Sequence, residues 1–246
     1  EEALVFKVGR EVVVLLLCTT LLVTEHETLF VFTGQEVINT EILADAEAIA
    51  MAAQTLGQRT MQPEALKAVI PVGASVDRYY DDGGYLVGGY PGQGVGWGGV
   101  MFGYCIRPPD PAVVGDAWRA MWRDRLDQTP MFLKSWLQHQ LRDETWVQGS
   151  VCEQYDRIQV PVLAVSGWND CWPNTVLRLL DNVNAPCRGV SGAWGHVYPN
   201  LGGPGPGIDF LGLALAWWDR WLRGDDNGVM DAPALLAYLQ DSHSPT

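Results

Sequence analysis

The chain has 246 residues, of which 48% are hydrophobic and 18% are charged. This composition is typical of a globular protein and excludes an intrinsically disordered chain. The formal net charge of −13 argues against nucleic acid and against an anionic membrane as partners. The length suits one large α/β domain, or one domain with a small insertion.

The five cysteines are scattered along the chain and contain no C-x-x-C pair, which argues against a disulfide framework and against a zinc site. We therefore expect a reducing compartment and a cytoplasmic location. The longest apolar run, Val12 to Val23, spans about 12 residues, whereas a membrane helix needs roughly 20. Lys7 and Arg10 precede this run, so a signal peptide is an alternative, but no small-residue cleavage site follows it. A buried strand is the favoured interpretation.

Residues 1–34 are dominated by Val, Leu and Thr, which indicates strands. The expected strands are Leu4–Val8, Val12–Cys18 and Leu29–Thr33. Thr40 is a predicted N-cap for a helix over Glu41–Leu56, which Gly57 ends. Ala68–Val72 is an apolar run short enough to be a buried strand.

Residues 83–110 are rich in Gly, Pro and aromatic side chains, and we interpret them as a loop that begins an insertion. Helices are predicted over Asp116–Leu126 and Met131–Leu141. The tryptophans in and near them are Trp118, Trp122, Trp136 and Trp146. Helices between two consecutive strands of a sheet predict a helical cap over the strand ends, at about residues 83–155.

Two further strands are predicted to present an acid and an imidazole side by side. Val162–Val165 is a buried parallel strand, and Asp170 follows it within a few residues. After a helix that includes Leu177–Val183, the next strand is Arg188–Ser191, and His196 lies just past its end. Reactive groups of open α/β sheets collect beyond the carboxyl ends of the strands.

The chemistry of such a pair is that of an acid–base catalyst. A buried carboxylate that accepts the Nδ1 proton of an imidazole fixes its tautomer and leaves Nε2 free to take a proton from a nucleophile. The prediction therefore requires that the side chains of Asp170 and His196, 26 positions apart, meet in the fold.

The C-terminal part contains one strong helix signal. Asp209 is a predicted N-cap, and the apolar residues of the next stretch recur at helical spacing up to Arg223, with Gly224 as the stop. A last strand is predicted to start at Leu235 and to run to Leu239.

Several blocks of the sequence, in this order, resemble the CocE/NonD family of serine hydrolases, which includes cocaine esterase and the X-Pro dipeptidyl-peptidases. The blocks are residues 65–82, 96–111, 162–170, 192–199 and 214–224. The resemblance runs from about Pro63 to the C-terminus, and it implies an α/β fold with an α/β-hydrolase sheet and a helical cap. It also implies cleavage of an ester or amide bond, acyl or X-Pro dipeptidyl, by a Ser-Asp-His triad.

Carried over by position, the resemblance makes Asp170 the triad acid and His196 the triad base. Trp172 matches a position that lines the acyl pocket in some relatives. The resemblance implies a small-molecule ester or amide substrate, no metal and no other cofactor, and it leaves homo-oligomer formation open.

The sequence departs from the family at the nucleophile. The family carries G-x-S-x-G-G upstream of the strand at Ala68–Val72, whereas this chain has no serine before Ser75. The upstream half of the family's sheet is not recognisable in residues 1–60, so we expect an atypical N-terminal part and a hydrolase core fragment over residues 61–240. A truncation or a frameshift would produce this pattern. It is therefore open whether the chain is an active enzyme, a non-catalytic remnant that binds ligands, or half of a split enzyme.

Substitutes for the missing serine are interpreted as structural. Gly94–Gly99 has the glycine pattern of the nucleophile elbow but contains no serine. Ser75 is interpreted as a turn residue, and Cys18 is interpreted as a thiol packed among apolar residues. Ser166 and Ser191 are expected to bond backbone groups in turns. The acids Asp77, Asp81 and Asp82 are expected to lie in a solvated turn. His26 and His139 have no partners at the spacing of metal ligands.

Overall fold

The computed structural model describes residues 12–17, 66–81, 92–148 and 150–241. The chain divides into two compact units. The first, here called the sheet unit, contains residues 1–33, 62–76 and 154–246, and the second, the helical unit, contains residues 34–61 and 77–153. That the helical unit caps the strand ends stays a prediction.

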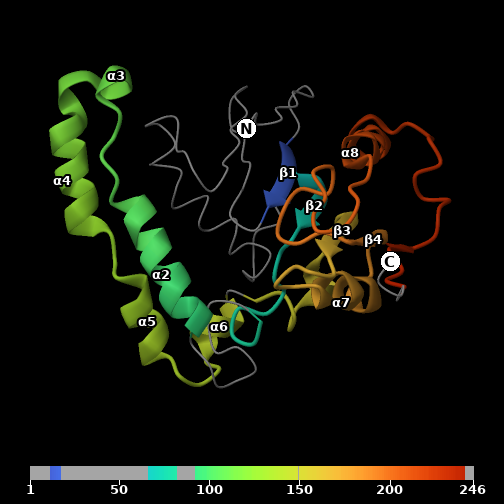
Figure 1. The fold of residues 1–246 in the computed structure, drawn as a ribbon, viewed down its shortest axis with the longest axis horizontal. Coiled ribbons are helices and arrows are strands. Elements are labelled where there is room, and N and C mark those ends of the chain that lie inside the picture. The colour runs from blue at the N-terminus through green and yellow to red at the C-terminus, as the bar shows by residue number, and fades with distance from the viewer. Residues whose placement is uncertain (1–11, 18–65, 82–91, 149, 242–246) are drawn as a thin grey trace, which may run out of the picture. The chain divides into compact units, whose positions relative to one another are not determined.

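The described part of the sheet unit contains a five-stranded parallel sheet in which each strand pairs with the next strand of the sequence (Figure 1). The strands, in order, are β1 (Val12–Leu17), β2 (Leu66–Val72), β3 (Val162–Gly167), β4 (Cys187–Gly192) and β5 (Leu235–Ala237). The predicted strands at Ala68, Val162, Arg188 and Leu235 are confirmed, as is the Val12 strand up to Leu17.

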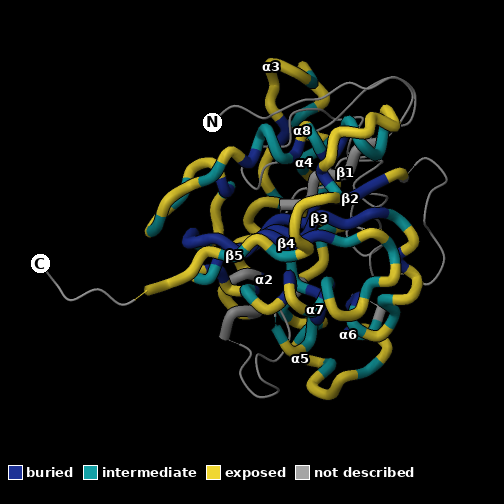
Figure 2. Tube along the Cα trace, turned by 90° about the vertical axis from the view of Figure 1, so that its right-hand side faces the viewer, coloured by how far each residue is buried: buried dark blue, intermediate teal, exposed yellow. Residues whose placement is uncertain are grey.

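The central strands β3 and β4 are buried on both faces, as parallel strands between covering elements are. All six residues of β3 are buried, and the tube of Figure 2 is dark blue there. The core of the sheet unit joins β2, β3 and β4 to the C-terminal helix through Ile70, Leu163, Val190 and Trp217. This buried sheet is the rigid base on which the strand-end loops rest.

The helices of the sheet unit are α7 (Asn174–Asn182) and α8 (Phe210–Trp218), and a π-helical turn, Asp219–Arg223, continues α8. The predicted N-cap is confirmed, since Asp209 accepts a hydrogen bond from the Gly212 N–H at 3.0 Å. The predicted stop is confirmed as well, because Gly224 adopts the left-handed conformation with φ of 79°.

The helical unit contains α2 (Gly92–Cys105), α3 (Pro111–Val114), α4 (Trp118–Gln128), α5 (Phe132–Gln138) and α6 (Glu144–Gln148), with a 3-10 turn at Gly115–Ala117. The two predicted helices are confirmed as α4 and as a shorter α5. The prediction of a loop over residues 83–110 is wrong where α2 forms.

Packing against α5 explains why the glycine-rich α2 is a helix. A Cβ placed on Gly98 would meet the Trp136 ring at 3.1 Å and the Leu133 Cβ at 3.4 Å. The glycine therefore lets the two helices approach closely. Each glycine costs a helix about 1 kcal/mol relative to alanine, but tertiary packing supplies most helix stability in proteins.

The other predicted elements lie outside the described residues. These are the strands Leu4–Val8 and Leu29–Thr33, the helix Glu41–Leu56, and the side chains of Cys18 and His26. Among the helices that the structure describes, none is both long enough and apolar enough to span a membrane.

Candidate active site

Asp170 lies in the turn that follows β3, and the turn holds its carboxylate in place. The Asp170 N–H donates to the Gly167 carbonyl at 3.1 Å, and its Oδ1 accepts from the Trp172 N–H at 3.2 Å. The side chain of Asp170 is only 2% exposed. A carboxylate in this position is fixed by the backbone before any partner side chain is considered.

His196 lies past the end of β4, and the pairing of β3 with β4 brings it to Asp170. The strands run in register to Gly167 and Gly192, and the Asn169 N–H donates to the Trp194 carbonyl at 3.2 Å, which ties the two loops together. The Nδ1 atom of His196 lies 3.2 Å from Oδ2 and 3.3 Å from Oδ1 of Asp170. The predicted meeting of these two side chains is confirmed.

The electrostatics of the pair favour an ionised carboxylate. Burial raises the pKa of Asp170, but the hydrogen bond and charge of His196 and the N–H groups of Cys171 and Trp172 outweigh it, so that the pKa lies below its ordinary value. The imidazole is 41% exposed. Its Nδ1 therefore faces the acid, while the second ring nitrogen, Nε2, remains for a reacting group.

Gly73 lies directly after β2, at the end of a third strand, and is next to both side chains of the pair. Its φ is +55°, and its N–H donates to the Val165 carbonyl at 2.8 Å. A Cβ at this position would meet Asp170 Oδ2 at 2.8 Å and His196 Nδ1 at 3.0 Å. Sequence reasoning did not single out Gly73, although a glycine immediately after a buried strand was the available signal.

Trp172 lies against the imidazole. It is buried, and its ring meets the His196 ring edge to face with centroids 5.3 Å apart. This contact limits how the imidazole can turn. The acyl-pocket role that the resemblance implies for Trp172 stays a prediction.

Cys171 is the residue that sequence reasoning missed at this site. The residue as a whole is exposed although its thiol is partly buried, and Sγ, a carboxylate oxygen of Asp170 and a ring nitrogen of His196 all lie within 4.8 Å of one another. Burial of the thiol and the charge of Asp170 raise its pKa. Because the thiolate is the nucleophilic form of cysteine, this environment does not activate Cys171 as a nucleophile.

The serines near the pair are structural. Ser166 and Ser191 face each other in register across β3 and β4, and both are buried. Ser166 Oγ donates to the Trp172 carbonyl at 3.4 Å, as expected, but the expectation for Ser191 is wrong, because its Oγ has no hydrogen-bond partner among the described residues. Both lie in strands rather than turns, since the strands extend one residue past them.

The other substitutes do not form an elbow in the described chain. Ser75 is half-buried in the segment after β2, and Gly94–Gly99 lies inside α2 instead of on a strand-to-helix turn. A nucleophile elbow requires a sharp turn between a strand and a helix. The interpretation of Gly94–Gly99 as a decoy therefore agrees with its helical conformation.

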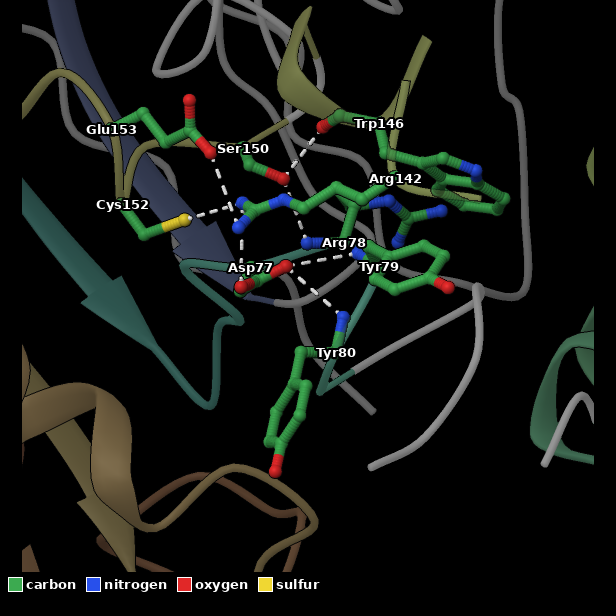
Figure 3. Close-up of polar contacts among 9 residues, drawn as sticks. All are labelled: Asp77, Arg78, Tyr79, Tyr80, Arg142, Trp146, Ser150, Cys152 and Glu153. Carbon is green, nitrogen blue, oxygen red and sulfur yellow. Dashed lines mark hydrogen bonds and ion pairs between the residues drawn. The ribbon is translucent and has the colours of Figure 1, made fainter. Parts of the chain in front are cut away.

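Asp77 is the anchor of a network in the helical unit, shown in Figure 3, and the expectation of a solvated turn is wrong for it. Its Oδ1 accepts from the N–H groups of Tyr79 and Tyr80, both at 3.0 Å, and its Oδ2 lies 3.4 Å from Arg142. Arg142 also pairs with Glu153 at 3.1 Å. The carboxylate is buried because the turn and the guanidinium satisfy it; Asp81 is half-buried, and Asp82 lies outside the described residues.

His139 has a carboxylate partner that spacing arguments overlooked. Its Nδ1 lies 2.5 Å from Oδ2 of Asp143, four residues on, and 3.3 Å from the Thr145 hydroxyl. The hydrogen bond to His139 is the main cause that lowers the pKa of Asp143. This pair, in the helical unit, is the natural control for the pair at the sheet edge.

The model of the X-Pro dipeptidyl-peptidase family (S15 family) matches residues 51–198. The match begins ahead of Pro63, where the resemblance seen in the sequence begins, and it ends before α8. No curated protein matches the sequence.

Two crystal structures of a CocE/NonD family hydrolase from Staphylococcus aureus resemble the fold, with TM-scores of 0.50 and 0.48 and 16% identity. Each comparison covers 77% of this chain and 29% of that chain. An aminopeptidase from a marine sediment archaeon, Thaumarchaeota archaeon, is 20% identical with a TM-score of 0.44, covering 71% of this chain and 33% of its own. At such identities the likeness shows the fold alone, a partial α/β-hydrolase sheet, and the chain spans less than a third of the Staphylococcus hydrolase.

Proposed function

The chain belongs to the X-Pro dipeptidyl-peptidase (S15) family, and from this membership we propose that Asp170 and His196 are the acid and base of a serine hydrolase that cleaves ester or amide bonds. The observation that carries the proposal is the contact of 3.2 Å between a buried carboxylate and Nδ1 of a half-exposed imidazole. This is the arrangement that general-base activation of a hydroxyl requires.

In the proposed reaction, Asp170 accepts the Nδ1 proton of His196 and stabilises the imidazolium that forms. Nε2 removes the proton of the attacking hydroxyl while that oxygen forms a bond to the substrate carbonyl carbon. The same proton then passes to the leaving alcohol or amine, and an acyl-enzyme remains. Water, activated by the same nitrogen, releases the acid product.

The proposal assigns no nucleophile, because the sequence contains no G-x-S-x-G elbow. It assigns a substrate class by family alone, an acyl ester or an X-Pro dipeptidyl amide. We propose that Trp172, whose ring lies 5.3 Å from that of His196, contacts the acyl part of such a substrate.

Hydrolysis of p-nitrophenyl acetate and of Gly-Pro-p-nitroanilide by the purified chain tests the proposal. We expect turnover that His196→Ala reduces by roughly 10⁴-fold, because the base and the nucleophile act as a unit. The matched control is His139→Ala, which removes the other carboxylate-paired imidazole and should leave the rates unchanged.

The absent elbow motif favours one second function, a non-catalytic protein that binds such compounds. It predicts that Gly-Pro dipeptide binds the wild type and His196→Ala equally well and that neither protein hydrolyses a substrate. Absence of turnover in the wild type, together with no labelling by a fluorophosphonate, would reject the hydrolase proposal in favour of this one.

A further inference from the structure

Three different ligand atoms converge at the end of β3 and β4. A carboxylate oxygen of Asp170, the thiol sulfur of Cys171 and a ring nitrogen of His196 lie within 4.8 Å of one another. Scattered cysteines without C-x-x-C spacing argued against a zinc site in the sequence. The fold changes that expectation, because it brings an imidazole to an acid and a thiol that are neighbours in the chain.

The dimensions of this trio suit a tetrahedral divalent ion. Zinc bonds to nitrogen and oxygen of 2.0–2.2 Å in a tetrahedron imply an edge of about 3.3 Å between those two ligands. The His196 Nδ1 and Asp170 Oδ2 atoms lie 3.2 Å apart. An edge from sulfur to nitrogen would be about 3.5 Å. The Cys171 sulfur lies within 4.8 Å of the other two ligand atoms, so metal binding requires it to approach them by at most about 1.3 Å.

We propose that Asp170, Cys171 and His196 form a binding site for a thiophilic divalent cation such as Zn²⁺, and that this ion blocks the Asp170–His196 pair. Three protein ligands of mixed type with an open fourth position are the arrangement of exposed zinc sites. The thiol and the imidazole select against Mg²⁺ and Ca²⁺, which prefer oxygen ligands.

The site is largely preformed. The Trp172 N–H holds the Asp170 carboxylate, the glycine at position 73 leaves room for the acid and the imidazole, and the Trp172 ring lies against His196. Cys171 and the His196 ring are exposed, so an ion can reach both from solvent. The net charge of −13 also attracts cations to the protein.

Zinc binding and acid–base catalysis exclude each other, and this consequence rests on the proposed function. A metal-bound imidazole nitrogen uses its lone pair and cannot carry a proton. If the ion takes Nδ1, the hydrogen bond to Asp170 is lost; if it takes Nε2, the base is lost. Zinc therefore inhibits the hydrolase, because it occupies an imidazole nitrogen of His196 that must carry or accept a proton during turnover.

The binding step is tested without any assay of hydrolysis. Chelator-treated protein is titrated with Zn²⁺ against a chromophoric chelator, and Co²⁺ is used as a spectroscopic substitute. We expect one ion per chain and a thiolate-to-cobalt charge-transfer band in the near ultraviolet. Cys171→Ser and His196→Ala should each weaken Zn²⁺ binding by about tenfold or more.

The matched control is Cys187→Ser, which removes a half-buried thiol of the same unit that belongs to no such cluster among the described residues, and it should bind Zn²⁺ like the wild type. Equal affinity of Cys171→Ser and wild type, no uptake of Zn²⁺, or a cobalt complex without the thiolate band would each overturn the inference. Circular dichroism confirms that the variants are folded.

The inhibitory step is tested with the ester substrate. We expect Zn²⁺ to inhibit the wild type at the concentrations at which it binds, and to inhibit Cys171→Ser only at concentrations about tenfold higher or more. If the wild type binds Zn²⁺ through Cys171 but hydrolyses nothing, the proposed function fails and the metal site stands. If hydrolysis depends on His196 and Zn²⁺ does not bind, the metal site fails and the proposed function stands.

Discussion

Gly73 is a position where one missing side chain keeps two reactive groups together. Alanine at this φ of +55° would cost about 1–2 kcal/mol in backbone strain, and its Cβ would press on Asp170 and His196. We predict that Gly73→Ala lowers kcat for ester hydrolysis strongly with little change in KM, because the displaced groups act in the reaction rather than in binding.

Gly224→Ala is the matched control for this prediction. Gly224 has φ of +79° but open space around its missing Cβ, so alanine there adds backbone strain without a clash. Both variants should lose similar stability in urea unfolding from the strain alone. Equal kcat values in the two variants would show that Gly73 has no positioning role.

The thiol of Cys187 should make the free energy of unfolding depend on pH in the alkaline range. Burial raises the pKa of its thiol from 9.0 to about 11. The pKa of the thiol is higher in the folded state than in the unfolded state, so the folded protein binds this proton more tightly. The resulting contribution to the free energy of unfolding is fully present below the pKa of the unfolded state. It is lost as the pH rises through the pKa of the folded state. The measurement is urea unfolding from about pH 8 to about pH 11.

The wild type should therefore lose stability relative to Cys187→Ser across this range. A constant difference between the two proteins at every pH would contradict the prediction. The variant is an appropriate reference because serine keeps the size of the side chain but does not ionise there.

At the scale of elements, the sequence predicts the sheet well because the cause is local. The strands β2 and β3 consist mainly of apolar residues in short runs, which is typical of strands that are buried on both faces of a parallel sheet. Asp209 and Gly224 mark the ends of a helix through their own backbone contacts. The meeting of acid and histidine follows from parallel strands with aligned ends.

What the sequence could not predict depends on contacts with distant residues. Helix α2 is stabilised where Gly98 meets α5, and Asp77 is buried because Arg142 lies beside it. The positions of Gly73 and Cys171 at the candidate site likewise require the third strand end and the loop geometry. Propensity and spacing carry no information on such partners.

The glycines of α2 give a prediction at this scale. Gly98 and Gly99 are adjacent in one helix, but a Cβ on Gly98 meets Trp136 at 3.1 Å while one on Gly99 meets nothing within 4 Å. Alanine should therefore stabilise the helix at Gly99 by about 0.5–1 kcal/mol through backbone entropy, and at Gly98 it should gain less or destabilise. Thermal unfolding followed by circular dichroism compares the two variants, and equal stabilisation would contradict close packing of α2 on α5.

At the scale of the whole molecule, every residue of the candidate site belongs to the sheet unit. The chain leaves that unit after Val76 and returns to it at Gln154. Asp170, Cys171, His196 and Gly73 therefore lie on the two flanks of an insertion. We therefore expect the geometry of the acid–base pair to depend on the sheet unit.

The network of Figure 3 joins the two ends of residues 77–153, the longer segment of the helical unit, since Arg142 contacts both Asp77 and Glu153. Arg142→Met would remove both ion pairs and leave the buried Asp77 carboxylate without its arginine partner. We predict a loss of about 1–3 kcal/mol in the stability of the helical unit and faster proteolysis within residues 77–153.

Arg223→Met is the matched control, because Arg223 also pairs with two carboxylates, Asp219 and Asp225, but is 61% exposed against 32% for Arg142. Exposed pairs contribute little, so this variant should change stability by no more than about 0.5 kcal/mol. If the two variants were equally stable, the contacts of Arg142 would be of the weak surface kind. If Arg142→Met opened the helical unit to protease while Zn²⁺ still bound through Cys171 and His196, the site would be shown to depend on the sheet unit alone.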